Sequence, residues 1–255
     1  MIIILSPAKT LDFEHDAVVK TMTEPRLVDY SAQIMKQLSE YDEPGLEKLM
    51  NISSKLASLN ALRHRNWSVK HTDKNSKQAI YAFRGEVYNG IDIDQFNADD
   101  IKFAQSHVRI LSGLYGVLRP LDGIQPYRLE MGTKLNVDNN KNLYDFWGNQ
   151  IAEVLEKDLN ATPKPVLVNL ASNEYYKSVK TSTLSAPVVT PIFKELKNGD
   201  YKVIAIYAKK ARGLMTAYAI KNQITNIDDL KTFDEQGYMF DVNMSTDTEW
   251  VFTRG

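Results

Sequence analysis

The sequence of 255 residues contains no cysteine, and this absence excludes several kinds of chemistry at once. Without a thiol there is no disulfide, no thiolate nucleophile, no iron–sulfur ligation and no cysteine zinc site. A chain without disulfides suits a reducing compartment, so we expect a cytoplasmic protein.

Long apolar runs are also missing. The first residues, MIIILSPAKT, hold a short apolar stretch that no basic segment precedes, which is not the pattern of a secretory signal. No stretch approaches the roughly 20 apolar residues that a membrane span requires. The sequence therefore predicts a protein without membrane contact.

Metal and cofactor motifs are scarce as well. The histidines, His15, His64, His71 and His107, show no spacing typical of metal ligands. The sequence has no glycine-rich dinucleotide fingerprint and no nucleophile elbow. We expect no metal site and no cofactor.

What the chain does have is an ordinary globular composition, with 43% hydrophobic and 25% charged residues, which suffices for a self-sufficient core. No linker or repeat interrupts residues 1–255, so we expect a single domain. Short apolar runs that predict strands, such as Ile2–Leu5 and 166–170, alternate irregularly with amphipathic segments that predict helices. The expected fold class is α/β (mixed α+β), a mixed sheet with packed helices.

Local signals predict further elements. Asn198-Gly199 indicates a hairpin between strands at 188–196 and 201–207, and a helix over 211–223 should follow. Further helices are expected over 25–41, 97–108 and 144–159.

Charge is nearly balanced over the whole chain, at −1, but it is unevenly distributed. Residues 60–84 hold six Lys or Arg and one Asp, and residues 201–221 hold five and no acid, so each segment carries +5. Residues 222–255 hold seven acids and two bases. We expect a basic and an acidic face on one domain, although each run could also be an ordinary solvated surface.

Residues 44–66 have the order of a helix-hairpin-helix, in which the second helix presents backbone N–H groups to a phosphate. The motif reads apolar, Pro, Gly, apolar, Gly, three residues, Ala, and residues 49–53 with Ala57 fill it. Asn51 and Ser53 replace both glycines, yet Asn tolerates the left-handed conformation and Ser caps helices. The alternative is a plain pair of packed helices.

The second helix of this unit should bury Leu56, Leu59 and Leu62 and direct its cations to DNA. Lys55 lies in its first turn, where the helix dipole favours an anion, and an aromatic platform follows the later arginines. The candidate phosphate-binding residues here are Asn51, Ser53, Ser54, Lys55, Arg63 and Arg65.

Three junctions elsewhere carry polar or cationic side chains. Lys209, Lys210 and Arg212 are expected between a strand and the start of a helix, where their charge opposes the helix dipole unless an anion lies nearby. Lys9 and Ser172 each follow a predicted strand, at the end where open sheets bind ligands. We expect these junctions and the hairpin cations to form one trough that admits a polyanion.

The segment 111–132 combines glycines with Arg, Tyr and Glu, which is typical of a pocket. Arg128 and Glu130 stand two apart and so face the same way on an extended chain, either as a structural ion pair or as part of a site. The candidate pocket residues are Lys9, Lys55, Asp73, Arg109, Arg128, Glu130 and Lys209.

Five motifs, in this order, resemble the YaaA family: ILSPAKTLD, LSGLYGVLRPLD, QPYRLEMG, NLASNEY and YAKKARGLM. The resemblance extends from residue 2 to about 252. It implies a bacterial cytosolic protein of hydrogen peroxide resistance that limits unincorporated iron and so protects DNA and proteins. It also implies a single-domain mixed α/β fold with a positively charged cleft, a helix-hairpin-helix and DNA binding.

A further resemblance concerns helix-hairpin-helix DNA glycosylases with lyase activity. Their Schiff-base lysine occupies the position matched by Lys55, and an aspartate follows at an interval similar to that of Asp73. The resemblance implies a lyase role for this pair.

Two hypotheses follow. The first is a DNA-binding stress protein that holds duplex or structured DNA through its backbone, with weak sequence preference. The alternative is an enzyme that acts on a nucleobase, nucleotide or damaged DNA site. In that case Lys9, Lys55 or Lys209 would be the nucleophile or anion clamp, and Glu130 an acid or base.

Overall fold

The computed structural model describes residues 1–255. Its main sheet has the strand order β11-β12-β9-β8-β1-β5-β6, and β10 pairs with β9. The strands of this sheet are β1 (Ile2–Leu5), β5 (Val108–Ser112), β6 (Gly116–Leu118), β8 (Leu167–Leu170), β9 (Val188–Lys197), β10 (Asp200–Lys202), β11 (Met239–Phe240) and β12 (Glu249–Arg254).

The centre of the sheet is parallel and its edges are antiparallel. β1 pairs in parallel with both β5 and β8, and β9 pairs in parallel with both β8 and β12. β6, β10 and β11 each add an antiparallel partner. The apolar run of β1 is completely buried, as expected for a strand covered on both faces. The predicted mixed α/β fold class is confirmed.

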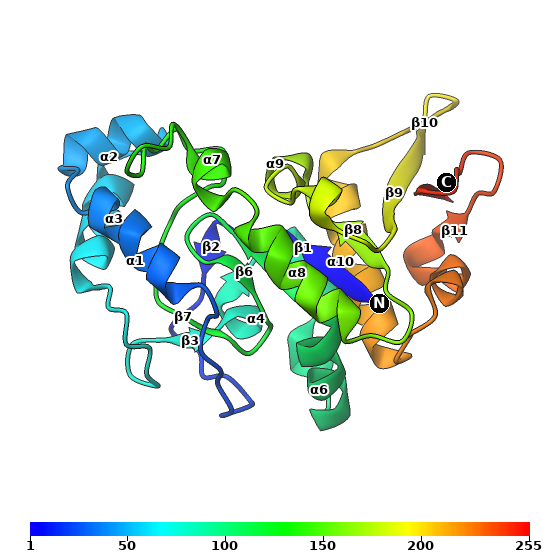
Figure 1. The fold of residues 1–255 in the computed structure, drawn as a ribbon. Coiled ribbons are helices and arrows are strands. Elements are labelled where there is room, and N and C mark those ends of the chain that lie inside the picture. The colour runs from blue at the N-terminus through cyan, green and yellow to red at the C-terminus, as the bar shows by residue number, and fades with distance from the viewer.

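Helices surround this sheet (Figure 1). They are α1 (Val28–Leu38), α2 (Glu43–Met50), α3 (Ser54–Asn66), α4 (Ala79–Ala82), α5 (Glu86–Ile91), α6 (Ala98–His107), α7 (Leu143–Trp147), α8 (Gln150–Asn160), α9 (Asn173–Tyr176) and α10 (Ala205–Lys221). Short 3-10 helices cover Ile93–Gln95, Thr181–Thr183, Ile227–Thr232 and Glu235–Gly237. Two small ladders pair β2 (Thr10–Leu11) with β4 (Phe83–Arg84), and β3 (Lys77–Gln78) with β7 (Gly123–Ile124).

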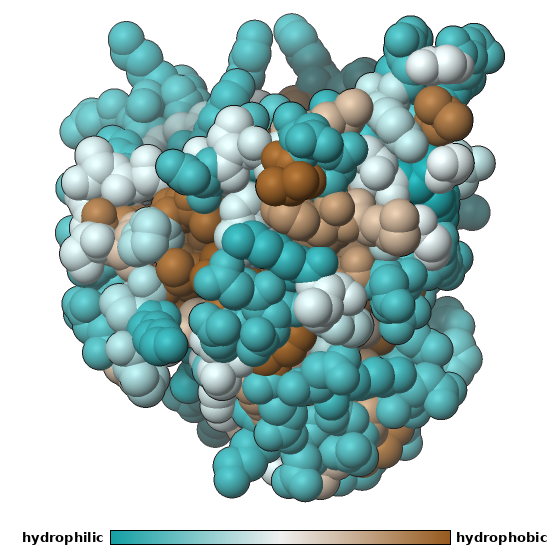
Figure 2. All heavy atoms as spheres, turned by 90° about the vertical axis from the view of Figure 1, so that its right-hand side faces the viewer, coloured by the Kyte–Doolittle hydropathy of each residue, from teal (hydrophilic) through white to brown (hydrophobic).

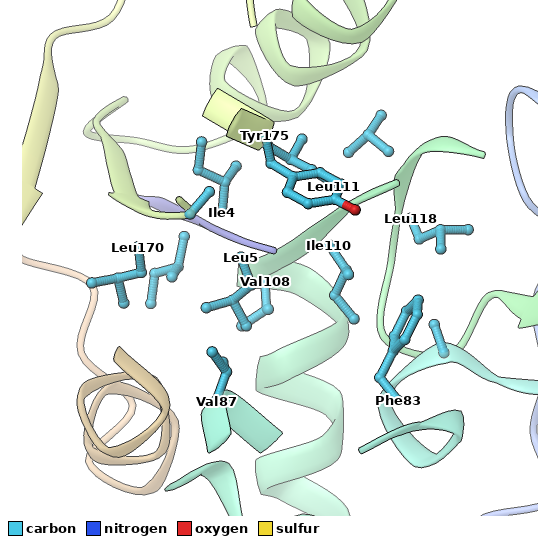
Figure 3. Close-up of a cluster of buried hydrophobic side chains, with 14 of the residues drawn as sticks. Ile4, Leu5, Phe83, Val87, Val108, Ile110, Leu111, Leu118, Leu170 and Tyr175 are labelled. Atoms are coloured by element: carbon cyan, nitrogen blue, oxygen red, sulfur yellow. The ribbon is translucent and has the colours of Figure 1, made fainter. Parts of the chain in front are cut away.

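Both faces of the central strands are packed. In Figure 3, Tyr175 covers the strands from one side, while Val87 of α5 lies on the other. The buried hydrophobic residues form one contiguous cluster. Helices α1, α2 and α3 gather at the end of the molecule opposite β11 and the C-terminus (Figure 1).

The opposite end carries the C-terminal strands. Figure 2 looks onto this end, where hydrophobic side chains show between predominantly hydrophilic ones. None of the helices combines the length and the apolar character needed to cross a membrane.

Helix α10 departs from the prediction. The second hairpin strand stops at Lys202, and the helix begins at Ala205 rather than at 211. Val203 and Ile204 are β-branched and favour a strand, but the alanines and long side chains that follow favour a helix. The hairpin turn itself is confirmed, with both Asn198 and Gly199 in the left-handed region.

Two other helices also differ. The helix expected over 144–159 is broken into α7 and α8, because Gly148 adopts a φ of 48°. In α3 the predicted inner face is wrong, since the three leucines at 56, 59 and 62 are exposed. The buried face carries Ala57, Asn60, Ala61 and His64.

Candidate functional site

A cavity of about 310 Å³ lies at the carboxyl ends of β1 and β8. The segments that follow these two strands line it together with β4, the start of α5 and one side of α10. We call it the strand-end cavity. Its charged lining residues are Lys9, Arg84, Glu86, Glu130, Glu174, Lys209 and Arg212.

Hydrogen bonds between the two strand ends fix the floor of this cavity. The Ser172 amide donates to Ser6 Oγ at 2.9 Å, and Ser6 Oγ donates to Ser172 Oγ at 3.2 Å. The Tyr88 hydroxyl of α5 donates to the Ser6 carbonyl at 3.0 Å. The loops after β1 and β8 are therefore tied to each other and to α5.

Arg212 is the cation of this cavity that is least compensated. Its guanidinium forms no hydrogen bond and no ion pair, and only its backbone carbonyl is engaged, by Thr216. Burial lowers the pKa of the Arg212 guanidinium, because desolvation disfavours the charged form. A partly desolvated charge without a partner costs free energy, so this position suits an anion.

The contact between α10 and α5 explains why Arg212 reaches the cavity. A Cβ at Gly213 would lie 1.9 Å from the Val87 carbonyl oxygen, and a Cβ at Gly90 would lie 2.4 Å from the Lys210 carbonyl oxygen. The backbones of the two helices thus touch, and the residue next to Gly213 is held against the start of α5.

Lys209 lies one turn before Arg212 on the same face of α10, exposed and without an ion pair. Lys210 points elsewhere and lines a different cavity, beside Asp92 and Lys221. The prediction that these three residues precede the helix is wrong, because α10 already begins at Ala205. Helix periodicity, not the helix terminus, brings Lys209 and Arg212 together.

Two of the three carboxylates that line the cavity have partners. Glu130 lies 2.7 Å from Lys9 Nζ and 3.4 Å from Arg128 Nη2, so the same-side placement of Arg128 and Glu130 is that of an ion pair. Glu174 accepts a hydrogen bond from the Gly132 amide at 2.9 Å. Arg84 is paired with Asp12 at 3.0 Å. The charged lining residues without such a partner are Glu86 and two cations of α10, Lys209 and Arg212.

Tyr175 closes the side of the cavity next to Glu130 and Glu174. Burial raises the pKa of its hydroxyl, and the neighbouring Tyr127 and Glu174 raise it further. Tyr175 therefore stays protonated and can serve as a hydrogen-bond donor.

A second cavity, of about 530 Å³, lies at the C-terminal end of α3. Segments 13–22 and 73–78 form its other walls. We call it the α3 cavity. It contains two of the predicted residues, Arg63 and Asp73, together with Trp67.

The structure separates Lys55 from Asp73. Lys55 is exposed in the first turn of α3 and lines neither cavity, whereas Asp73 lines the α3 cavity near the other end of the helix. The helical rise alone puts about 12 Å between Lys55 and Arg63. The single predicted trough is thus two cavities, and Lys55 and Asp73 do not share one.

Carboxylates of α2 occupy the turn at which the hairpin was expected to meet phosphate. Asn51 adopts the left-handed conformation, as the turn requires. However, Ser54 Oγ donates to Glu47 at 2.8 Å, and Ser58 Oγ donates to Glu43. Ser53, the N-cap of α3, makes no side-chain capping bond, and Arg65 is exposed further along the helix.

Arg109 lies in neither cavity, which corrects its placement in the pocket. Its Nε donates to Asp158 at 2.6 Å, and its Nη1 donates to the carbonyls of Gln105 and Val108. Burial alone would raise the pKa of the Asp158 carboxyl, but hydrogen bonds from Arg26 and Arg109 lower it. Arg109 is thus committed to a buried ion pair on α8.

Sequence reasoning overlooked several lining residues. Arg84 and Glu86 flank Gly85 between β4 and α5, and this junction of a strand and a helix was the available signal. Tyr88 and Tyr175 gave no signal, because buried tyrosines read as core. No group of three or more histidine or carboxylate side chains is placed to hold a metal ion.

Comparison with known proteins places this chain in a family. Residues 1–244 match the family described as peroxide stress protein YaaA. A UPF0246 protein of Cellvibrio japonicus is 48% identical over 254 residues, and one of Aliivibrio fischeri is 50% identical over 254 residues. Each alignment covers 100% of this chain and 98% of the relative. The resemblance seen in the five motifs is confirmed, and the chain belongs to the YaaA family of peroxide stress proteins.

Proposed function

We propose that this protein acts in peroxide stress by binding the phosphate backbone of DNA, with the strand-end cavity as its main anion site. The family description supports the role in peroxide stress. The observation that carries the DNA contact is Arg212, a partly buried guanidinium without a partner, which shares its cavity with the unpaired Lys209.

A phosphate fits these groups better than a neutral ligand does. Guanidinium forks match phosphate oxygens, and a phosphate would replace the hydration that burial removes from Arg212. The protonated hydroxyl of Tyr175 and the hydroxyl of Ser172 add donors. Backbone contacts of this kind carry no base information, so sequence preference is weak.

Other cations continue the surface beyond the cavity. Arg128, paired with Glu130, interacts electrostatically with Arg63 and lowers the pKa of that guanidinium, after burial, which is the larger cause. Exposed Lys55 and Arg65 on α3 extend the cationic surface. Because the Glu47 carboxylate of α2 lies beside the start of α3, the hairpin is an auxiliary DNA contact in this proposal.

Salt dependence tests the proposal. If about five phosphates are neutralised, the logarithm of the binding constant falls against log salt with a slope of about −4 to −5. We expect the double variant Lys209→Ala/Arg212→Ala to bind a mixed-sequence duplex at least tenfold more weakly. The magnitude of its salt slope should be smaller by about 2. Anisotropy titration at several salt concentrations measures both.

Lys102→Ala is the matched control, since Lys102 is exposed on α6 and lines neither cavity. It should bind as the wild type does. Wild-type binding that is absent or insensitive to salt, or a double variant that binds normally, would refute the proposal.

An enzyme acting on a damaged DNA site is the second candidate, favoured by the Lys9–Glu130 pair at 2.7 Å in a cavity of ligand size. The Lys9 amine would add to the aldehyde of an abasic site and release water to form an imine, with Glu130 accepting the amine proton. Borohydride reduces such an imine to a stable adduct. A covalent adduct lost in Lys9→Ala would support the enzyme, and the absence of an adduct leaves a binding protein.

A further inference from the structure

The α3 cavity is larger than the strand-end cavity, and the main anion site of the proposed DNA contact lies outside it. Buried side chains hold its walls in place. The Lys77 ammonium donates to the carbonyls of Asp12 and His15 at 2.9 and 2.6 Å. Gln78 Nε2 donates to the carbonyls of Val19 and Thr21 at 2.7 and 2.9 Å. Segment 13–22 has almost no regular structure, so these bonds preserve the cavity.

Trp67 gives this cavity a fixed aromatic surface. Its indole Nε1 donates to the Tyr115 hydroxyl at 3.0 Å, and Tyr115 is completely buried. The polar end of the indole is thus anchored in the core, while the partly exposed ring lines the cavity. Aromatic rings held in this way are platforms on which nucleobases stack.

Arg63 supplies an anion contact one helical turn from Trp67. Its guanidinium is half-buried, and its one hydrogen bond is a 3.5 Å contact to Asn60 in the same helix. It pairs with no carboxylate, and Lys74, also without an ion pair, lines the same cavity. Asp73 is the nearest acid in sequence, and it is exposed.

We propose that the α3 cavity binds one nucleotide, with its base against Trp67 and its phosphate at Arg63 and Lys74. An aromatic platform beside unpaired cations recognises this combination of a flat ring and an anion. The nucleotide can be free, or it can be an unpaired residue of a nucleic acid strand. The site does not depend on the strand-end cavity.

The two cavities are close enough for one DNA strand to contact both. Gln125 and Pro126 line the α3 cavity, and Glu130 lines the strand-end cavity. Four residues of chain span at most about 14 Å. In this respect alone the inference rests on the proposed DNA binding.

Intrinsic fluorescence can follow this site. Trp147 and Trp250 are buried, so Trp67 is the tryptophan that a ligand in the cavity reaches. The titrants are deoxyadenosine monophosphate, a single-stranded oligonucleotide and the matching duplex. We expect saturable quenching by the monophosphate or by the single strand, and whichever quenches at lower concentration identifies the source of the nucleotide.

Arg63→Ala and Arg65→Ala form a matched pair, because both residues lie on α3 and Arg65 lies outside the cavity. We expect Arg63→Ala to weaken binding of deoxyadenosine monophosphate at least tenfold, Lys74→Ala to weaken it severalfold, and Arg65→Ala to leave it unchanged. Trp67→Phe should abolish the quenching, while calorimetry still detects binding within about fivefold of the wild type. Far-ultraviolet circular dichroism confirms that each variant is folded.

The double variant Lys209→Ala/Arg212→Ala separates the two proposals. It should bind the nucleotide as the wild type does and bind the duplex at least tenfold more weakly. No quenching of the wild type by any titrant, or equal losses in the Arg63 and Arg65 variants, would overturn the nucleotide site and leave the DNA proposal intact.

Discussion

The strand-end cavity and the first turn of α3 both contain residues predicted to contact an anion, and they differ in what surrounds them. In the cavity, Lys209 and Arg212 have no carboxylate partner. At the start of α3, serine hydroxyls already donate to Glu43 and Glu47 of the neighbouring helix. Backbone geometry alone therefore does not make an anion site, because the nearby side chains decide whether the position is vacant.

The largest expected effect concerns the packing that builds the strand-end cavity. Gly213→Ala would place a methyl group within 1.9 Å of the Val87 carbonyl oxygen. The helices must separate to admit it, so we expect a loss of about 3 kcal/mol in the free energy of unfolding. Denaturant unfolding measures this loss. Lys209→Ala, exposed on the same helix, is the control and should unfold as the wild type does. Normal stability of Gly213→Ala would contradict the described contact.

The stability of the protein should also depend on pH through a buried histidine of α3. His64 of α3 is buried, and neither ring nitrogen has a partner. Burial, and then Arg63, lower its pKa to about 4, from an ordinary value of 6.5. The unfolded chain thus binds a proton below pH 6.5 that the folded chain refuses until about pH 4. Stability from this residue is complete above pH 6.5 and declines as the pH falls.

We expect His64→Phe to remove about 2 kcal/mol of the stability difference between pH 7 and pH 5. Unfolding curves of both proteins at the two pH values measure it. The same pH dependence in wild type and variant would show that His64 is not the group responsible. Arg212, in contrast, keeps its charge over this range.

A smaller effect is expected when the carboxylates beside the first turn of α3 are neutralised. Glu43→Gln/Glu47→Gln removes two negative charges beside the first turn of α3 and keeps hydrogen-bond acceptors for the serines. We expect duplex affinity at low salt to rise about threefold to tenfold, because like-charge repulsion of phosphate disappears. Glu153→Gln, exposed on α8, should have no effect. An unchanged or reduced affinity of the double variant would mean that the hairpin does not approach DNA.

The sequence predicted features that depend on local chemistry. The buried run of β1, the Asn198-Gly199 turn and the capping Asn97 of α6 all carry their signal within a few residues. The ends of β1 and β8 were also predicted as ligand positions, because parallel strands deliver their following loops to one edge.

The features that the sequence did not predict depend on contacts between distant segments of the chain. The exposed leucines of α3 follow helical spacing, yet the small residues Ala57 and Ala61 form its buried face. No local pattern shows that Arg109 pairs with Asp158, or that Arg212 forms no ion pair. Partners far along the chain determine whether a cation is available, and one sequence does not reveal them.

The two glycines between α5 and α10 have a consequence for ligand selection. Arg212 and Lys210 point about 160° apart around the axis of α10, so only a large rotation of the helix would exchange Arg212 for Lys210 at the cavity. Contact between the backbones at Gly90 and Gly213 prevents that rotation. The glycine pair therefore selects which cation of the Lys-Lys-Ala-Arg run faces the strand-end cavity.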